Sequence, residues 1–273
     1  MIELPEAVVI AQQITETLGA KLIAHAVANA SPHKFAWYTG DPAEYNKKLS
    51  GKVIGKGYGI ASFIEFEAGD MILSISAPIH YHVEGENRPK KHQLLLEFTD
   101  GTAISSSAQM WGGFFCFPTG EKGGFPDADL ARARPSPLVE DFNRPYFNTL
   151  FNPDTPALSA KAFLATEQRI PGLGNGVLQD ILWTARIHPK RKMSNLEERD
   201  IQNMFEAVKH VLAEMTAQGG RDTERDLFGH FGGYKTILSK NTVGTPCPVC
   251  GTTIQKEPYL GGSIYYCAGC QKL

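Results

Sequence analysis

Four of the five cysteines in the chain lie near its C-terminal end, in two Cys-x-x-Cys pairs. Cys247 and Cys250 form the first pair, Cys267 and Cys270 form the second, and sixteen residues separate the pairs. Thiolates at this spacing can bind one Zn²⁺ tetrahedrally at about 2.3 Å each when a β-hairpin brings the two pairs together. A fully closed set of cysteines leaves no position for water, so we expect one structural zinc. Chance pairs or redox disulfides are the alternative interpretation.

A glycine-containing turn, Ile170-Pro-Gly-Leu-Gly-Asn175, is the second segment with chemical potential. Its glycines permit a tight backbone that can approach a ligand closely. Asn175 would begin the next helix, where free N–H groups and the positive end of the helix dipole favour a phosphate. An ordinary turn between helices with an asparagine cap explains the same residues, so the turn alone does not decide between the two.

Helical periodicity surrounds this turn and continues towards the cysteines. The pattern predicts helices near residues 159–167, 176–185 and 195–218. Ser194-Asn195 ahead of two glutamates is a plausible cap for the last helix, and Gly219-Gly220 a plausible end.

The N-terminal part is different, because short β-rich runs are broken there by Gly, Pro and Asn. The predicted strands are residues 60–66, 71–75, 93–98 and 102–105, with residues 99–101 as a hairpin turn. An amphipathic helix from Pro5 to about Gly19 precedes them, and its apolar side is marked by Val8, Val9, Ile14 and Leu18. This pattern favours a β-sandwich with one helix packed on it.

The organisation is therefore α+β. The expected divisions are a β-sandwich over residues 1–119, a linker over 120–152, a helical domain over 153–240 and a zinc finger over 241–273.

No apolar run is long enough to span a membrane, and no secretory signal is visible. Free thiols fit a reducing cytoplasm. The net charge of −2 does not indicate a nucleic-acid binder, although Arg186, Lys190, Arg191 and Lys192 form a basic cluster.

With the N-terminus included, the chain resembles the formamidopyrimidine-DNA glycosylase / endonuclease VIII family of base-excision repair enzymes. The matching pieces are Glu3-Leu-Pro-Glu6, Pro171–Asn175 with Ala185–Pro189, Gly219-Gly220 with Asp226, and the four cysteines. The resemblance implies a β-sandwich, a helix–two-turn–helix module and a zinc finger. It also implies that damaged or abasic DNA is bound between the domains and a flipped base is excised. A monomer acting in the cytoplasm, at the nucleoid, is expected.

The resemblance also assigns roles to individual residues. Glu3 matches the acid that opens the deoxyribose and protonates the leaving base, which requires a partly protonated carboxyl. Glu6 matches a second acid beside it and a helix start. Asn175, with Gly174 before it, matches the phosphate ligand of the family, and Arg169 lies near a basic position of the family. Because of the resemblance, we also expect Lys190 and Arg191 to contact phosphates of the DNA.

Position 2 departs from the family pattern. Family members expose an N-terminal proline whose amine forms a Schiff base with the sugar, but here the residue is Ile2. Met1 should remain in place, because its removal generally requires a small second residue. The α-amine would then lie one residue, about 3.5 Å, upstream of the family nucleophile. We therefore expect imine-dependent strand nicking to be weak or absent, unless a re-routed first turn lets Met1 act as the nucleophile.

Several family contacts to DNA are also replaced. Around Gly59 the family carries a phosphate-binding lysine, and the nearest lysine here is Lys56. Residues 74–78 replace the stretch with the wedge methionine. Gln109, Met110 and Trp111 stand where the family has arginines and a wedge phenylalanine, and Gly262 replaces the arginine of the zinc finger. Since each lost cation removes a share of affinity, we expect weaker binding to ordinary duplex DNA.

Three interpretations stay open. A specialised glycosylase could use Trp111 as a wedge, with Trp37 or Phe35 lining single-stranded or distorted DNA. A catalytically silent relative would only bind DNA. A zinc-dependent adaptor is supported only by apolar hairpin residues, Tyr259-Leu260 and Tyr265-Tyr266. Retention of Glu3, Glu6 and Asn175 favours the glycosylase.

Two other residue sets are given ordinary interpretations. His80 and His82 alternate on one predicted strand with no third ligand in view, so we expect surface residues and not a second metal site. Cys116 is predicted to be a core residue.

Overall fold

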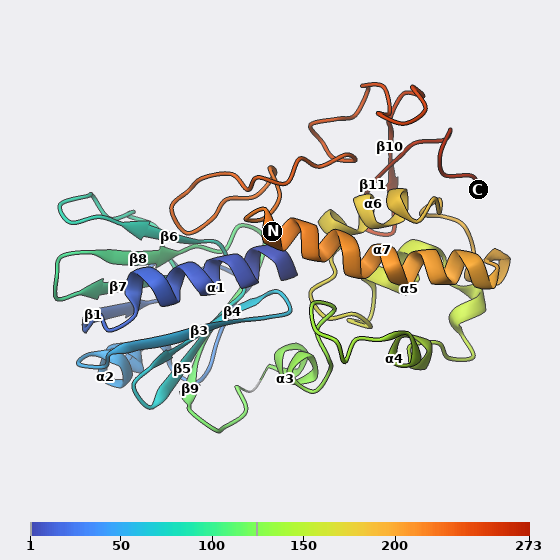
Figure 1. Cartoon of the computed structure of the whole chain (residues 1–273). Coiled ribbons are helices and arrows are strands. Elements are labelled where there is room, and N and C mark those ends of the chain that lie inside the picture. The colour runs from blue at the N-terminus through green and yellow to red at the C-terminus, as the bar shows by residue number, and fades with distance from the viewer. Residues whose placement is uncertain (1, 124) are drawn as a thin grey trace.

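The structure, a computed structural model, describes residues 2–123 and 125–273 and has an α+β architecture (Figure 1). The N-terminal part contains two sheets. One sheet has the strand order β1-β7-β8-β6 and the other has the order β2-β9-β5-β4-β3. Their bounds are β1 Ile23–Ala28, β2 Ala36–Tyr38, β3 Ile54–Ile60, β4 Phe63–Ala68, β5 Met71–Ile75, β6 Ile79–His82, β7 Leu94–Phe98, β8 Ala103–Ser106 and β9 Gly112–Pro118.

Helix α1 (Leu4–Leu18) lies against strand β3. Two glycines of that strand make the close approach possible. A side-chain carbon on Gly57 would lie 2.3 Å from the carbonyl oxygen of Ala11, and one on Gly59 would lie 2.6 Å from Val8. The buried face of α1 joins the inner faces of the strands in one hydrophobic core. The short 3₁₀ helix Pro42–Glu44 and helix α2 (Tyr45–Leu49) follow β2.

The second core belongs to the helical part of the chain. It is built mainly from α5 (Ala160–Ala165), α6 (Asn175–Thr184) and α7 (Glu198–Ala217), which carries its apolar residues along one face. The remaining elements are α3 (Pro126–Arg132), α4 (Arg144–Thr149) and the short 3₁₀ helices Thr155–Ala157 and Met193–Asn195. Phe142 and Phe147, within the predicted linker, are fully buried in this second core. Among the described helices, none has the length and apolar character that crossing a membrane requires.

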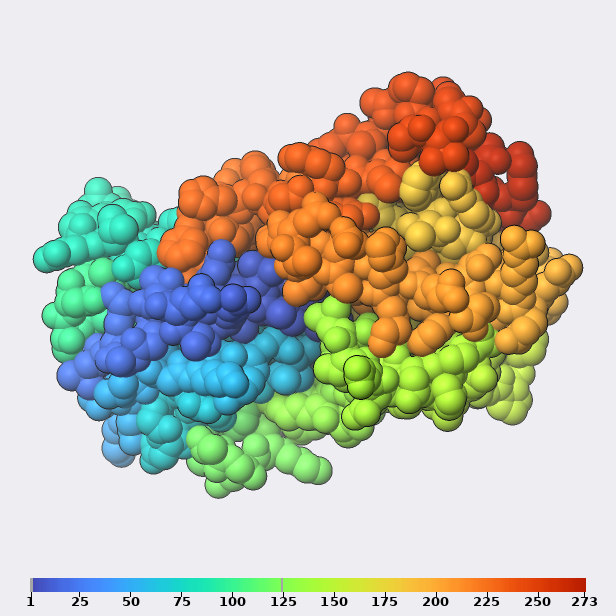
Figure 2. Space-filling model, in the orientation of Figure 1, coloured from blue at the N-terminus to red at the C-terminus, as the bar shows by residue number. Residues whose placement is uncertain are grey.

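The C-terminal hairpin, β10 (Gln255–Tyr259) and β11 (Gly262–Tyr266), packs beside α6. Before it, the segment that follows α7 returns to the sheets, and Figure 2 shows this orange segment lying next to the blue N-terminal helix. Tyr81 N–H of β6 donates to the Leu227 carbonyl at 2.8 Å, and Gln13 of α1 donates to Asp226 at 3.0 Å. Residues 218–239, which we call the return loop, therefore join the helical part to the sheets.

The predicted fold class is confirmed, and the helices agree to within a few residues. Three details were wrong. Residues 60–66 are not one strand, because the chain turns at Ala61, whose φ is 56°, between β3 and β4. Helix α7 is capped by Glu197, whose side chain forms a capping box with Asp200, and not by Ser194-Asn195. Val8 and Val9 are only partly buried, because Ala7, Ile10 and Ala11 form the inner face of α1.

Candidate functional site

The buried cluster of Glu3, Glu6 and Arg221 is the centre of the candidate site. The Arg221 side chain donates to Glu6 at both oxygens, from Nε at 2.9 Å and from Nη2 at 2.7 Å. Its Nη1 lies 3.6 Å from Oε2 of Glu3. The exposed fraction is only 5% for Glu3, 3% for Glu6 and 2% for Arg221. Buried carboxylates need such pairing, since an isolated buried charge is costly.

Glu3 also completes helix α6 of the helical part. Its Oε1 accepts the N–H of Gly176 and its Oε2 accepts the N–H of Val177, both at 2.8 Å. The residue before the helix, Gly174, has no side chain that could cap it. The first turn of a helix leaves N–H groups without partners, and a carboxylate there is also favoured by the helix dipole. The acid is therefore held by the segment that follows the glycine-containing turn.

Close backbone packing fixes that turn in place. Gly172 has φ +80°, and a side-chain carbon there would lie 2.6 Å from the backbone of Ala61. The Gly172 carbonyl accepts the N–H of Leu4 at 3.0 Å. The turn thus contacts both the β3–β4 turn and the start of α1, which explains why glycine is needed there.

Burial raises the pKa of the Glu3 carboxyl above its usual range, against the lowering effects of Arg221 and of the N–H groups of Val177 and Gly176. The nearby Glu6 adds to the rise. For Arg221, the two carboxylates outweigh burial and raise its pKa, so the guanidinium stays charged. The cluster consequently holds a fixed cation beside an acid that can keep its proton.

Two small cavities are lined by both Ile2 and Trp111, and Glu3 lines one of them. One, of about 80 Å³, is lined by Ile2, Glu3, Trp111 and the 172–174 turn, among others. The other, of about 120 Å³, is lined by Ile2, Ser76, Pro78, Gln109, Met110 and Trp111. The structure therefore brings the predicted wedge residues close to Ile2, with Met110 68% exposed. Ile2 itself is buried in the sheet core. Met1, the candidate amine, lies outside the described residues.

Asn175 begins α6 and faces the hairpin. Its Nδ2 donates to the carbonyl of Ser263 at 2.9 Å, while its buried Oδ1 has no hydrogen-bond partner. Gln179 strengthens the same junction, since its Oε1 accepts the Tyr265 N–H at 3.0 Å. The hairpin is thus fixed to the residue that the sequence predicts to bind phosphate.

Lys161 occupies the space that an arginine at position 262 would use. The Lys161 ammonium group lies 3.6 Å from where a side-chain carbon on Gly262 would begin, and it donates to the Tyr259 carbonyl at 2.7 Å. Only 4% of this lysine is exposed. The sequence did not predict this position of Lys161, because a lysine within a helical pattern is usually a solvent-exposed residue.

The other predicted DNA contacts are dispersed. Lys56 is exposed on β3, with its ammonium group 5.3 Å from the Tyr58 ring. Arg169 is buried and pairs with Glu167. In the basic cluster, Lys190 pairs with Glu257 at 2.6 Å, and Arg191 pairs with Asp200 at 2.9 Å. The structure does not gather these cations around Glu3, and their contact with DNA stays a prediction.

The four cysteine sulfurs converge at the base of the hairpin. They all lie within 4.8 Å of one another, with 3.8 Å between Cys247 and Cys270 and 3.3 Å between Cys250 and Cys267. Tetrahedral thiolates around Zn²⁺ at about 2.3 Å would lie about 3.8 Å apart. The residues therefore fit one metal ion. Cys116, by contrast, is buried in the sheet core, as predicted.

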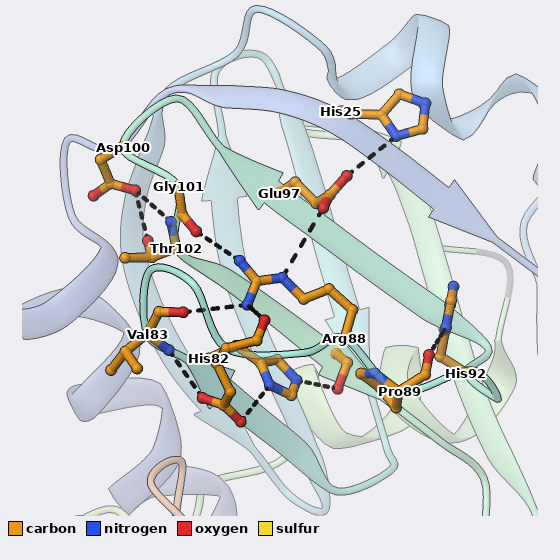
Figure 3. Close-up of polar contacts among 12 residues, drawn as sticks. His25, His82, Val83, Arg88, Pro89, His92, Glu97, Asp100, Gly101 and Thr102 are labelled. Atoms are coloured by element: carbon orange, nitrogen blue, oxygen red, sulfur yellow. Dashed lines mark hydrogen bonds and ion pairs between the residues drawn. The ribbon is translucent and has the colours of Figure 1, made fainter.

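A second cluster corrects the surface prediction for His82, whereas His80 is exposed as predicted. Glu86 completes a group of three possible ligands, and His82 is buried. Its two ring nitrogens lie 3.0 Å from Glu86 Oε1 and 2.8 Å from Ser105 Oγ. Figure 3 shows the surrounding bonds, in which Arg88 binds the carbonyl of Val83 and that of Gly101. His82 is thus a hydrogen-bonded interior residue, which alternation along a strand could not reveal.

Sequence reasoning missed Arg221. The sequence offers one signal for it. Arg221 directly follows the paired glycines at 219–220, which permit a tight turn that can direct the chain back towards its start. Its partners, Glu3 and Glu6, lie more than two hundred residues away in sequence, so no local pattern could have linked them.

Comparison with known proteins agrees with this arrangement. Residues 134–226 match the family described as Formamidopyrimidine-DNA glycosylase H2TH domain. The formamidopyrimidine-DNA glycosylase of Lactobacillus gasseri is 27% identical and is covered over 99% of its length by 100% of this chain. That of Symbiobacterium thermophilum is 28% identical, with 99% of this chain and 89% of the relative covered.

Solved structures show the same fold. The Lactococcus lactis Fpg in complex with DNA containing an abasic site has a TM-score of 0.82 at 23% identity, with 99% of this chain and 100% of that chain covered. The MutM (Fpg) protein of Thermus thermophilus has a TM-score of 0.81 at 24% identity, with 98% of each chain covered.

The fold places this chain in a class of two-part proteins built around a helix–two-turn–helix module. The features that define the class are the two sheets, the helical module and the hairpin with four cysteines. Within that class, the match over residues 134–226 and the similarity to curated relatives along the whole chain support the formamidopyrimidine-DNA glycosylase / endonuclease VIII family. The chain differs from the usual pattern of the family in carrying Ile2 in place of the proline.

Proposed function

We propose that this protein is a DNA glycosylase of base-excision repair that removes a damaged base with little or no strand nicking by the imine route. The observation that carries the proposal is the Glu3 carboxyl. It has a raised pKa, lies at the N-terminus of α6 and lines a cavity with Ile2 and Trp111. Relatives named formamidopyrimidine-DNA glycosylase support the class of reaction.

In this proposal a water molecule adds to C1′ of the deoxyribose as the N-glycosidic bond breaks, and Glu3 supplies the proton that the leaving base takes up. A carboxyl with a raised pKa keeps its proton nearer to neutral pH, and a general acid at the reacting group contributes about 10²- to 10⁴-fold to the rate. The N–H groups of Gly176 and Val177 then stabilise the charge of the carboxylate that forms. Arg221 stabilises the same charge from 3.6 Å.

The weak imine chemistry follows from the start of the chain. The backbone nitrogen of Ile2 is a peptide amide when Met1 is present, and an amide nitrogen is not a nucleophile for the sugar carbon. The Ile2 side chain is only 3% exposed and belongs to the sheet core. Its burial gives position 2 a packing role in place of the reactive amine.

DNA would lie along the face that carries Asn175, Lys161 and the hairpin. We propose that Cys247, Cys250, Cys267 and Cys270 hold one structural Zn²⁺ that keeps the hairpin folded. We also propose that Asn175 contacts the DNA backbone through its Nδ2 amide, whose second hydrogen is not needed for the bond to Ser263 and can be donated to a phosphate oxygen. Gln109, Met110 and Trp111 would fill the gap left by the flipped base. We further propose that the protein acts as a monomer on DNA in the cytoplasm.

Glu3→Gln tests the reaction. We expect base release from formamidopyrimidine, oxidised pyrimidine and oxidised purine lesions, each in single-stranded and in duplex DNA, to fall at least 100-fold, with DNA affinity preserved. Glu16→Gln is the matched control, because Glu16 is exposed on the same helix. Borohydride trapping on abasic DNA should give little adduct. Excision that persists in Glu3→Gln contradicts the assignment of the acid, and an efficient adduct on Met1 contradicts the absence of imine chemistry.

A further inference from the structure

Four aromatic side chains form a row that ends at the candidate site. We call His33, Phe35, Trp37 and Trp111 the aromatic row. Each neighbouring pair of ring centroids, from His33 to Phe35, to Trp37 and to Trp111, is 6.3 Å apart. The exposed fraction is 46% for Phe35, directly before β2, and 42% for Trp37 on β2, which is high for large rings. None of the proposed catalytic steps uses these two exposed rings.

The sheet explains why the rings face outwards. Strand β2 runs parallel to β9, with Ala36 opposite Gly112 and Trp37 opposite Gly113. Ala36 and Tyr38 pack against the sheet core, so the alternate side chains of Phe35 and Trp37 lie on the other side of the strand. The Phe115 ring occupies the space where a side chain on Gly113 would begin, 2.2 Å from that position. The row is therefore built by the register of an edge strand.

The row is continuous with the two cavities that Ile2 and Trp111 line. Trp111 lines both of these cavities, together with Ile2, and one of them also contains Glu3. A chain of bases lying on Phe35 and Trp37 would consequently lead to the residue proposed to protonate the leaving base.

The charges around the row favour a polyanion. From Lys21 to Gly40 the sequence contains no aspartate or glutamate. The Lys34 ammonium group lies 5.3 Å from the Phe35 ring. The Ser31 N–H donates to the His92 carbonyl at 3.1 Å, which brings exposed Lys90 and Lys91 to the same region. Aromatic rings interleaved with lysines are typical of surfaces that bind single-stranded nucleic acid.

We propose that the aromatic row binds the unpaired bases of single-stranded DNA next to the lesion. This inference rests on the proposed function and names the strand form that the site takes. The ring spacing of 6.3 Å is near twice the rise per nucleotide of about 3.4 Å along one duplex strand. A stretched strand can therefore place one base on each ring, whereas a duplex keeps its bases covered by each other.

The test measures binding of fluorescent oligo-dT, about twelve nucleotides long, to the full-length protein by anisotropy. Trp37→Ala and Phe35→Ala should each weaken this binding roughly 5- to 100-fold, the range expected for loss of one stacked base. Trp37→Phe should restore most of the affinity, because it keeps a ring. Val53→Ala is the matched control, since Val53 is also 46% exposed and lies outside the row. Lesion-free duplex binding should change little in each variant.

The outcomes separate this inference from the proposed function. Two results would overturn the aromatic row as a DNA site: no binding of oligo-dT to the wild type, or equally tight binding to the wild type, Trp37→Ala and Phe35→Ala. Neither result would affect the proposal that Glu3 takes part in excision. Sedimentation that shows self-association lost in Trp37→Ala would also overturn it, by assigning the row to a second copy of the chain. If the wild type binds oligo-dT through the row but excises no base, the result supports the row as a DNA site and contradicts the proposed glycosylase function.

Discussion

The Arg221 guanidinium lies 3.6 Å from the carboxylate of Glu3 while it binds both oxygens of Glu6 at 2.7 to 2.9 Å. One cation from the return loop thus serves two acids at the start of the chain. Because all three groups are almost fully buried, none can exchange its partner for water. The pairing contributes to the stability of the site, while burial keeps the pKa of Glu3 above its usual range in spite of the nearby cation.

Arg221→Ala should destabilise the protein strongly. The change leaves Glu3 and Glu6 buried without their cation, and breaking a buried ion pair in this way costs about 3 to 5 kcal/mol. Urea denaturation followed by circular dichroism measures the free energy of unfolding. Arg225→Ala is the control, because Arg225 lies in the same loop but is exposed and stacks on Phe231. Equal losses in both variants would show that the loop, and not the ion pair, is responsible.

Excision should depend on pH through Glu3. Burial raises the pKa of this carboxyl, so the proton needed for base release is retained at higher pH than on an exposed glutamate. The rate should therefore fall as pH rises through the raised pKa. The free energy of unfolding should also fall as pH rises through this pKa, because the charged form of Glu3 is disfavoured in the folded state. Single-turnover rates across pH check this, and Glu3→Gln should remove the dependence on that group. A rate that rises with pH across this range would contradict Glu3 as the acid.

Gly176→Ala should perturb the site, whereas Gly262→Ala should be tolerated. A side-chain carbon on Gly176 would lie 1.6 Å from Arg221 Nη1, and one on Gly262 has only ordinary contacts at 3.6 Å. Forcing Arg221 from its place should cost about 1 to 3 kcal/mol, as overpacking does. Thermal unfolding of the two variants makes the comparison, and equal midpoints would mean that the guanidinium moves without penalty.

Removal of zinc should unfold the hairpin and lower DNA affinity. The hairpin core consists of Cys247, Cys267, Ile254, Leu238 and Trp183, and few other apolar contacts hold it together. Small metal-bound units of this kind depend on the ion for folding. Treatment with a strong chelator, followed by anisotropy on duplex DNA and metal analysis, measures both effects. Unchanged affinity after loss of the metal would favour the adaptor interpretation of the hairpin.

Lys161→Gln should weaken duplex binding and reduce its dependence on salt. Lys161 lies at the position left by the missing arginine, beside Asn175. Loss of one phosphate contact should lower the slope of log affinity against log salt by roughly 0.9. Lys47→Gln is the control, because Lys47 is exposed on α2. A slope that changes equally in both variants would show only an effect of net charge.

Local patterns predicted most of the fold but only part of the site. The cysteine spacing predicted the convergence of the four sulfurs, and helical periodicity predicted α6 and α7. The turn at Ala61 was missed, because an alanine at positive φ has no sequence signal and apolar residues continue across it. Arg221 and Lys161 were missed because their roles depend on contacts between distant segments, which periodicity does not encode.

The capping of α6 by Glu3 has a consequence for how the protein unfolds. The helix in one part of the molecule is completed by a carboxylate from the other part, and Arg221 secures that carboxylate from the return loop. Cutting the chain between the sheets and the helical part would leave N–H groups without acceptors on one fragment and two buried acids without a cation on the other. Neither fragment would be a complete folding unit. The sheets and helices should therefore melt in one cooperative transition, although each has a hydrophobic core of its own.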